Sequence, residues 1–416
     1  MKKDYAISIY LDKRRAKANG KFPVKLRVFA SISRKQKLYP TIFDLTEKEF
    51  ESIWLSTKPR NENKRVRLKI QSVENRADDV AKELNPFSFE HFERKLYRKK
   101  GEGIKVSYHY TELIKEYKKN DRLGTADSYK YSEKAIQEFV ENSQKKNYSK
   151  LSFYDIDKFW LNDFEKYLLH TNRSNTTVGI YLRPLRAIFN KAIEENEIEK
   201  ELYPFGKRKY QIPASRSVKK TLSKEQLSVL FNSTPKTKEQ QRAKAFWFFS
   251  FNSNGMNIKD IALLKFKNID NDTIKFYRAK TQFTSKTDLK LITIYLNDYM
   301  KSFIKEYGNT NKHPNNYVFN ILSEAMTPEE QRNKIKNFTR YINQHLKKLC
   351  ESIGLPNEIS TYYARHSFAT SSIRKGASME FMQESLGHKD IKTTQAYFDG
   401  FEDETKKEFA NQIMNF

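Results

Sequence analysis

The fold of this chain is decided by three short stretches in its last quarter: TYYARHSFAT at 361–370, SLGH at 385–388 and TTQAYFDGF at 393–401. Each supplies a group needed to cut a phosphodiester without a metal ion. Arg365 is a permanently charged, planar fork that can hold two phosphate oxygens. His388 follows Gly387 at an expected helix end, so its ring can point into a cleft. Tyr397, on the next short helix, becomes a nucleophile candidate because a nearby arginine can stabilise charge at phosphorus.

The ordered set carries this inference, since the chain has 24 tyrosines and a single one would say little. The composition supports a polyanionic partner. Lysine and arginine total 78 against 51 acidic residues, a formal charge of +27. Such an excess is typical of proteins that bind nucleic acid; an anionic membrane surface, or lysines that serve solubility alone, are the weaker alternatives.

Other function classes are disfavoured. Mean hydropathy is −0.82, and no stretch approaches the roughly 20 apolar residues of a membrane helix. Asp4 and the alternation after it argue against a signal peptide. Cys350 is the single cysteine and the seven histidines are scattered, so we expect no disulfide, no metal and no cofactor. We therefore expect a cytoplasmic, nucleoid-associated bacterial protein.

The chain is too long for one core, and we expect a multidomain, mainly α protein with small β elements. Residues 1–100 are predicted to hold a three-stranded sheet over 5–43 with a basic outer face, then helices near Thr46 and over 64–84. Thr46 and Glu49 form a capping-box pattern. The stretch LNPFSFEHFERKLYRKKGEG breaks the pattern and predicts a linker.

Residues 105–205 predict a central helical bundle. Its four helices are expected over the ranges 107–119, 125–141, 155–170 and 174–195. The last contains Pro184, which predicts a kink. It also carries Arg183 and Arg186 among apolar residues, and both are candidates for DNA binding.

Residues 206–220 predict a linker rich in proline, glycine and basic residues. Lys207, Arg208 and Lys209 would follow a phosphate backbone, unless the segment is a plain solvated linker. Residues 221–416 predict a mixed α/β domain. It should contain a short amphipathic helix (SKEQLSVLFN), a buried helix (QRAKAFWFFSFN), and a β-hairpin from DTIKFYRAKTQ and LKLITIYL.

With these motifs the chain resembles a tyrosine recombinase of the phage integrase family, across all three domains. The resemblance implies an arm-type DNA-binding domain, a helical core-binding domain and a catalytic domain. Arg365 matches the second catalytic arginine, His388 the late His-or-Trp position and Tyr397 the nucleophile. Lys280 matches the hairpin lysine, which in the family protonates the leaving 5′ oxygen because an alkoxide leaves poorly without a proton.

One departure from the family pattern concerns its first arginine. The family has Gly-x-Arg where this chain has Gly255-Met256-Asn257, although the acidic residue that follows is kept as Asp260. Asparagine cannot give a charged bidentate grip. Arg278 shares a strand face with Lys280 and is a candidate substitute, or else a contact to the DNA backbone. Arg242 and Lys259 are weaker candidates.

A second departure is Tyr362, where the family has His or Lys. A phenol can hydrogen-bond a phosphate oxygen but is a poor base at neutral pH. His366, beside Arg365, is interpreted as a structural histidine.

The resemblance implies metal- and ATP-independent transesterification through a 3′-phosphotyrosyl intermediate. Two duplexes cut in four places imply a tetramer on double-stranded DNA, bound at core and arm sites with accessory DNA-bending proteins. The apolar stripe of Phe409, Ile413 and Phe416 would dock on a neighbouring subunit or on its own domain. The function expected is integration or excision of a mobile element. The alternatives are a DNA invertase of the same chemistry, a regulator whose catalysis has decayed and, less in keeping with the layout, a type IB topoisomerase.

Overall fold

The computed structural model describes residues 4–14, 16–99, 101–214, 220–280 and 289–397, together with residues 407, 410 and 411. The chain forms two compact units, Met1–Ala214 and Ser215–Phe416. The boundary lies within the predicted 206–220 linker. The tail residues Phe409, Ile413 and Phe416 lie outside the described residues, so the docking of the tail stays a prediction.

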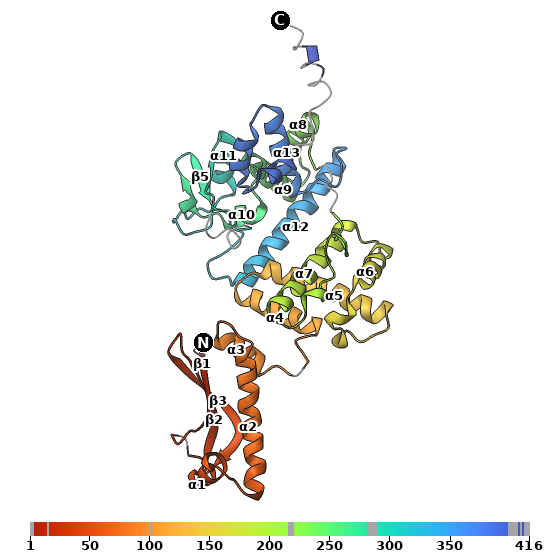
Figure 1. Cartoon of the computed structure of the whole chain (residues 1–416). Coiled ribbons are helices and arrows are strands. Elements are labelled where there is room, and N and C mark those ends of the chain that lie inside the picture. Colours follow the sequence, from red (N-terminus) through yellow and green to blue (C-terminus); the bar gives the residue numbers. More distant parts are fainter. Residues whose placement is uncertain are drawn as a thin grey trace. The chain divides into compact units, whose positions relative to one another are not determined.

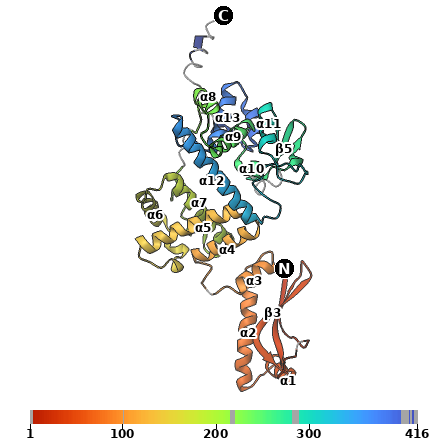
Figure 2. The same cartoon turned by 180° about the vertical axis from the view of Figure 1, so that it is seen from behind.

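The first unit begins with the predicted antiparallel sheet, in the order β1 (Tyr5–Leu11), β2 (Phe22–Ala30) and β3 (Lys35–Leu45). Figures 1 and 2 show these strands lying along the long helix α2 (Asn61–Lys82). Val24, Leu26 and Val28 alternate inward and share a core with Ile70 of α2. The three strands are therefore confirmed. The outer face is basic only in part, since exposed Phe29 and Ile42 stand beside Arg27.

The predicted capping box is present. Thr46 Oγ1 accepts from the Glu49 N–H and the Glu49 carboxylate accepts from the Thr46 N–H, which starts α1 (Glu47–Phe50). The chain then makes a π-helical turn over Glu51–Leu55 before α2.

The linker predicted after α2 is wrong in its middle, where the structure has helix α3 (Phe89–Leu96). Ser88 caps it by accepting the His91 N–H at 3.3 Å. Phe92 and Leu96 are buried in the core that the sheet and α2 share. A two-turn apolar stripe is enough to fold once a neighbouring core covers it.

The bundle contains α4 (Val106–Lys119), α5 (Leu123–Glu138), α6 (Lys158–His170) and α7 (Asn175–Glu194). All four predicted helices are confirmed near the expected bounds. Helix α7 continues through Pro184, with Leu182, Leu185 and Phe189 in the core. Arg183 and Arg186 are exposed on the opposite side of α7. Short elements connect these helices: a π-helical turn at Phe139–Ser143 and 3-10 turns at Tyr148–Lys150, Phe153–Asp155 and Lys200–Leu202.

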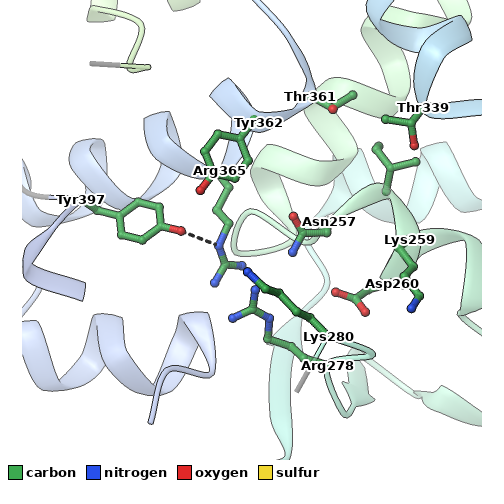
Figure 3. Close-up of a pocket in the computed structure, with 11 residues that line it drawn as sticks. Asn257, Lys259, Asp260, Arg278, Lys280, Thr339, Thr361, Tyr362, Arg365 and Tyr397 are labelled. Carbon is green, nitrogen blue, oxygen red and sulfur yellow. Dashed lines mark hydrogen bonds between the residues drawn. The ribbon is translucent and has the colours of Figure 1, made fainter. Parts of the chain in front are cut away.

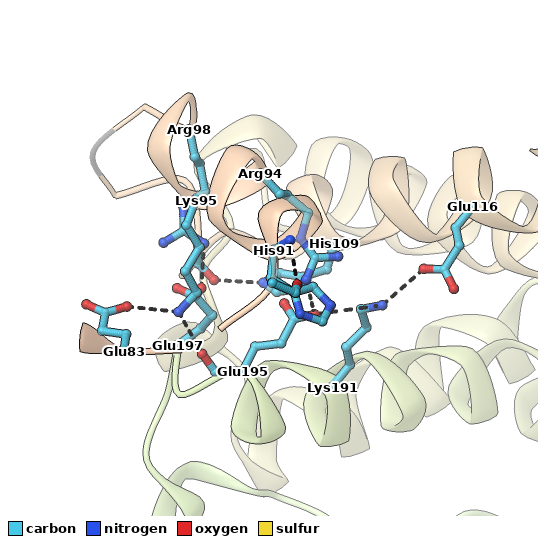
Figure 4. A network of polar contacts seen from close by, with 12 residues as sticks. Glu83, His91, Arg94, Lys95, Arg98, His109, Glu116, Lys191, Glu195 and Glu197 are labelled. Carbon is cyan, nitrogen blue, oxygen red and sulfur yellow. Dashed lines mark hydrogen bonds and ion pairs between the residues drawn. The ribbon is translucent and has the colours of Figure 1, made fainter. Parts of the chain in front are cut away.

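Polar contacts tie α3 to the bundle (Figure 4). Lys95, almost buried, donates to Glu83 at 2.9 Å and lies 3.5 Å from Glu197. Arg98 pairs with the same Glu197 at 2.5 Å, and Arg94 pairs with Glu195 at 2.6 Å. We call these five residues and Glu83 the α3–α7 ion-pair cluster.

The first part of the predicted 206–220 linker is also packed rather than free. Phe205 and Tyr210 are buried in the bundle core, and the Tyr210 hydroxyl donates to Glu165 at 2.6 Å. Lys207, Arg208 and Lys209 form the exposed turn between these two aromatic anchors. Two buried rings thus turn half of the expected linker into part of the bundle.

The second unit is mixed α/β, as predicted, with a small antiparallel sheet in the order β4-β5-β6. Its core surrounds α9, whose Phe246, Trp247 and Phe249 are buried, so the predicted buried helix is confirmed. Among the described helices, none is both long and apolar enough for a bilayer-spanning segment. The elements are α8 (Lys224–Asn232), α9 (Lys238–Asn252), α10 (Ile258–Leu263), a 3-10 turn (Phe266–Asn268), β4 (Ile269–Asp270), β5 (Thr273–Phe276), β6 (Ile292–Tyr295), α11 (Asp298–Tyr307), α12 (Pro328–Ser352), α13 (Thr361–Arg374), α14 (Met379–Leu386) and α15 (Ile391–Gln395).

Candidate active site

Helix α13 presents Arg365 to a cavity of the second unit. The helix begins where the Thr361 N–H donates to Asn343 of α12 at 2.8 Å. One turn later, Arg365 points inward with 4% of its surface exposed. A buried guanidinium needs partners for its five N–H groups.

Four of those donors are occupied. Nη1 donates to the Gly255 carbonyl at 3.1 Å, and Nη2 donates to the Leu386 carbonyl at 2.7 Å and to His388 Nε2 at 3.1 Å. Nε donates to the Tyr397 hydroxyl at 3.3 Å (Figure 3). The side chain is thus fixed in orientation, with one Nη1 hydrogen left for a ligand.

Gly255 is required where it stands. Its φ of +65° favours glycine, and a Cβ there would lie 2.6 Å from the Arg365 Cα. The loop between α9 and α10 can therefore approach α13 closely enough for its carbonyl to hold Arg365.

His388 lies behind Arg365 and does not line the cavity, so the expectation that its ring points into a cleft is wrong. Gly387, at φ +62°, ends α14 in a left-handed turn and aims His388 inward. Because Nε2 accepts from a permanent cation, Nδ1 carries the hydrogen and donates to Thr394 Oγ1 at 3.0 Å. Burial, then the charge of Arg365, lowers the pKa of His388 to about 3, so the ring is neutral near pH 7.

Tyr397 occupies the turn just after α15. Its N–H donates to the Thr394 carbonyl at 2.9 Å, and its carbonyl accepts from Thr370 Oγ1 at 3.0 Å. Its ring contacts two imidazoles, with centroid distances of 4.4 Å to His366 and 5.4 Å to His388. The nucleophile candidate is therefore held by backbone bonds, ring contacts and one guanidinium.

The cavity has a volume of about 370 Å³ and brings together most of the predicted site residues (Figure 3). Besides Arg365 and Tyr397, it is lined by Asn257, Ile258, Lys259, Asp260, Arg278, Lys280, Thr339, Thr361 and Tyr362. Lysine, arginine and amide donors therefore line the same cavity as the phenol. No group of side chains suited to hold a metal ion occurs in the described ranges.

Arg278 and Lys280 lie beyond β5, which ends at Phe276, so the prediction that the two residues share one face of a strand is wrong. A hydrogen bond holds this segment in place instead: the Asp260 carboxylate accepts from the N–H of Ala279 at 2.9 Å. That bond fixes the backbone between the two cations. Burial raises the pKa of Asp260. Burial and the charge of Arg365 lower the pKa of Arg278, which donates to the Leu386 carbonyl at 3.3 Å.

The remaining candidate residues differ in whether they line the cavity. Arg242 does not line the cavity; its guanidinium lies over the rings of Phe246, Phe338 and Tyr341 at 5.7, 5.3 and 5.9 Å. Lys259 does line it. Tyr362 is half-exposed in the cavity, and burial followed by the neighbouring Tyr397 raises its pKa.

Four features of the site were not found from the sequence as parts of it. Gly255 and Asp260 were noted only to align the motif, although a glycine and an acid flanking Asn257 were a usable signal. Thr394 lies three residues before Tyr397 in a polar run and gave no such signal. The Leu386 carbonyl could not be found, because a backbone group has no sequence signature.

Two regions of the chain match models of known protein families. Residues 106–212 match the phage integrase SAM-like domain, and residues 220–404 match the phage integrase family. The tyrosine recombinase XerA of Thermococcus kodakarensis is 24% identical over 235 residues, 56% of this chain and 74% of that protein. XerC of Pediococcus pentosaceus is 22% identical over 306 residues, 71% of this chain and 92% of that protein.

Two solved structures share the fold. The Tn1549 transposon integrase, in complex with circular intermediate DNA, aligns with a TM-score of 0.52 and 16% identity, covering 74% of this chain and 99% of that one. The XerH recombinase bound to a palindromic difH substrate aligns with a TM-score of 0.50 and 16% identity, covering 87% of this chain and 92% of that one.

Proposed function

The chain belongs to the phage integrase family of tyrosine recombinases and is a site-specific recombinase, and we propose that it integrates or excises a mobile genetic element with Tyr397 as its nucleophile. The observation that carries the role of Tyr397 is its hydroxyl, 3.3 Å from Arg365 Nε in a cavity that Lys280 also lines. A nucleophile, a charge clamp and a proton donor then face one small volume.

The reaction is a pair of transesterifications. Tyr397 Oη attacks the scissile phosphorus and its phenol proton passes to solvent water. The bond from phosphorus to the 5′ oxygen breaks, and Lys280 gives a proton to that oxygen. A 3′-phosphotyrosyl bond now joins protein and DNA. The 5′-hydroxyl of a partner strand then attacks the phosphorus and returns its proton to Lys280, while the bond to tyrosine breaks and the released Tyr397 takes a proton from solvent. Each step exchanges one phosphoester for another, so the bond energy is conserved.

Arg278 is proposed to replace the arginine that the family has at Asn257. Its support is a shared acceptor, because Arg278 and Arg365 both donate to the Leu386 carbonyl. Two guanidinium groups this close repel each other unless an anion lies beside them. A phosphate in the cavity would relieve this repulsion, while Asn257 and Tyr362 add neutral hydrogen bonds.

The other regions are proposed to bind the DNA. We assign 1–100 to arm sites and 105–205 to the core site, joined through 206–220 to the catalytic region 221–416. Exposed Arg183 and Arg186 on α7, and the turn of Lys207, Arg208 and Lys209, would contact phosphates. Four cut strands require four protomers, so we propose a tetramer on double-stranded DNA, with DNA-bending proteins as accessory partners at the bacterial nucleoid.

The experiment that tests this proposal needs no knowledge of the target site. The protein is incubated with supercoiled plasmid in EDTA beside Tyr397→Phe, and relaxed plasmid and DNA held covalently after SDS are measured. Relaxation and a covalent complex with the wild type alone are expected. A covalent complex that persists in Tyr397→Phe would overturn the assignment of the nucleophile.

A second candidate is a DNA-binding regulator with decayed catalysis, which Asn257 favours. It predicts specific DNA binding with neither relaxation nor covalent complex, and with no gain from Asn257→Arg. An inverting rather than integrating enzyme would give the same plasmid result, and would differ in the product formed between two sites on one molecule.

A further inference from the structure

We propose that His366 is a positioning residue for strand cleavage: its ring packs against the ring of Tyr397 and keeps the phenol aligned when the phosphate enters. This inference rests on the proposed nucleophile. It assigns a role in the reaction to a histidine that the sequence indicated to be only structural.

The geometry places His366 against the nucleophile. It follows Arg365 on α13, so the two side chains leave the helix in directions about 100° apart. Arg365 points into the cavity, whereas the His366 ring lies 4.4 Å from the Tyr397 ring, with 32° between the planes. The His366 ring also contacts the ring of Tyr362, with 4.6 Å between the two centroids. His366 thus stands between two phenols of the site.

The electrostatics keep this ring neutral. Burial, then the positive charges of Lys220 and Arg365, lowers the pKa of His366 to about 4. Its Nε2 is buried and has no hydrogen-bond partner among the residues that the structure describes. A histidine held as a neutral ring, with a buried nitrogen unused, acts here through its aromatic face.

The need for such a contact follows from how Tyr397 is held. Its hydroxyl accepts from Arg365 Nε at 3.3 Å, and it also hydrogen-bonds with the Tyr362 hydroxyl. A phosphate that binds this guanidinium competes for the same N–H, because three of the other four donors hold Gly255, Leu386 and His388. Once that N–H turns to the phosphate, the phenol keeps its ring contacts and the hydroxyl of Tyr362, which is itself proposed to hydrogen-bond the phosphate. His366 makes the shorter of the two imidazole contacts.

The test uses the full chain and a synthetic duplex spanning a cleavage position that the wild type marks covalently on the plasmid. His366→Ala removes the ring, and His366→Phe keeps a ring without nitrogen. His345→Ala is the matched control, since the His345 ring packs against the ring of Tyr341, with centroids 4.6 Å apart, outside the cavity. We expect single-turnover cleavage to fall about 10- to 100-fold in His366→Ala, with wild-type rates in the other two and unchanged affinity for the duplex.

A second substrate separates positioning from proton transfer. With sulfur in place of the bridging 5′ oxygen, the leaving group departs without a proton. Lys280→Ala should recover on this substrate, whereas His366→Ala should stay slow, because its defect lies in the attack. The melting temperature of each variant is measured alongside, and His366→Phe keeps the question open to test if His366→Ala does not fold.

The outcomes are distinct. If wild-type protein forms no covalent complex, the proposed function fails before this inference is reached. If it does, wild-type cleavage by His366→Ala overturns the positioning role. Recovery of His366→Ala on the sulfur substrate would place His366 on the leaving-group side instead. Cleavage by His366→Phe as slow as by His366→Ala would mean that the nitrogen, and not the stack, matters.

Discussion

At the scale of single residues, the positive charge proposed to act on the scissile phosphate comes from two elements that are distant in sequence. Arg365 on α13 and Arg278 beyond β5 meet at the Leu386 carbonyl, whereas Asn257 offers only a neutral amide. Arginines held in this way act on the charge that develops in the transition state more than on ground-state binding.

Arg278→Ala should therefore slow cleavage by about 100- to 1000-fold, the usual effect of losing one such donor, and leave DNA affinity nearly unchanged. Arg278→Lys should fall between, because an ammonium keeps the charge but loses the fork. Single-turnover formation of the covalent complex measures both. Arg242→Ala, outside the cavity, is the control, and near-normal cleavage by Arg278→Ala would show that Arg278 is not the substitute. If Arg278→Ala is slow, as expected, adding Asn257→Arg to that variant should restore part of the cleavage rate.

The histidines predict how stability depends on pH. The pKa values of His366 and His388 fall from 6.5 to about 4 and about 3 in the folded chain. Between pH 6.5 and about 4 the unfolded chain takes up protons that the folded chain does not, so stability must fall as pH falls through this window. Calorimetry from pH 7.5 to 5 should show a lower melting temperature at pH 5. The decrease in melting temperature should be smaller in His366→Phe, because one of the two histidines that take up a proton on unfolding is gone. An identical decrease would contradict the lowered pKa of His366.

At the scale of elements, the sequence predicted the helices whose ends are marked by neighbouring residues in the chain. Thr46 and Ser174 begin helices at the predicted places, because a cap acts within one turn. Helix α3 was missed, since its two turns are helical only because Phe92 and Leu96 reach a core made by the sheet and α2. The contacts of Arg365 reach Gly255 in a loop, Leu386 at the end of α14 and Tyr397 in the turn after α15, and no spacing along the chain predicts them.

The α3–α7 ion-pair cluster gives a prediction at this scale. Lys95 and Glu197 are each 7% exposed at the side chain, so removing Lys95 leaves a buried carboxylate that keeps Arg98 but loses its second cation. Lys95→Met should lower the free energy of unfolding of the first unit by about 3 kcal/mol, measured by urea denaturation. Lys191→Met, at the more exposed pair with Glu116, should cost under about 1 kcal/mol. Equal effects of the two changes would mean that burial does not strengthen this cluster. Adding Glu197→Gln to Lys95→Met should recover part of the loss.

At the scale of the whole molecule, the formal charge of +27 sets how the protein meets DNA. Each phosphate neutralised by lysine or arginine releases counterions, so affinity should fall steeply and linearly with salt on a log–log plot. The share of that slope that belongs to residues 1–99 measures the arm contacts. A chain without them should bind core DNA with a shallower slope and cleave it, but integrate poorly.

The ion-pair cluster sharpens this truncation, because cutting after residue 99 removes Arg94, Lys95 and Arg98 and leaves Glu195 and Glu197 without them. The shortened chain should therefore melt lower in its bundle than the full chain, for a reason unrelated to DNA. Glu195→Gln with Glu197→Gln in the shortened chain should raise its melting temperature, since a neutral amide is cheaper to bury than an unpaired carboxylate. If the repaired chain still cleaves core DNA yet integrates poorly, the missing function is arm binding. If repair restores integration, residues 1–99 serve the stability of the bundle and the arm-site assignment is wrong.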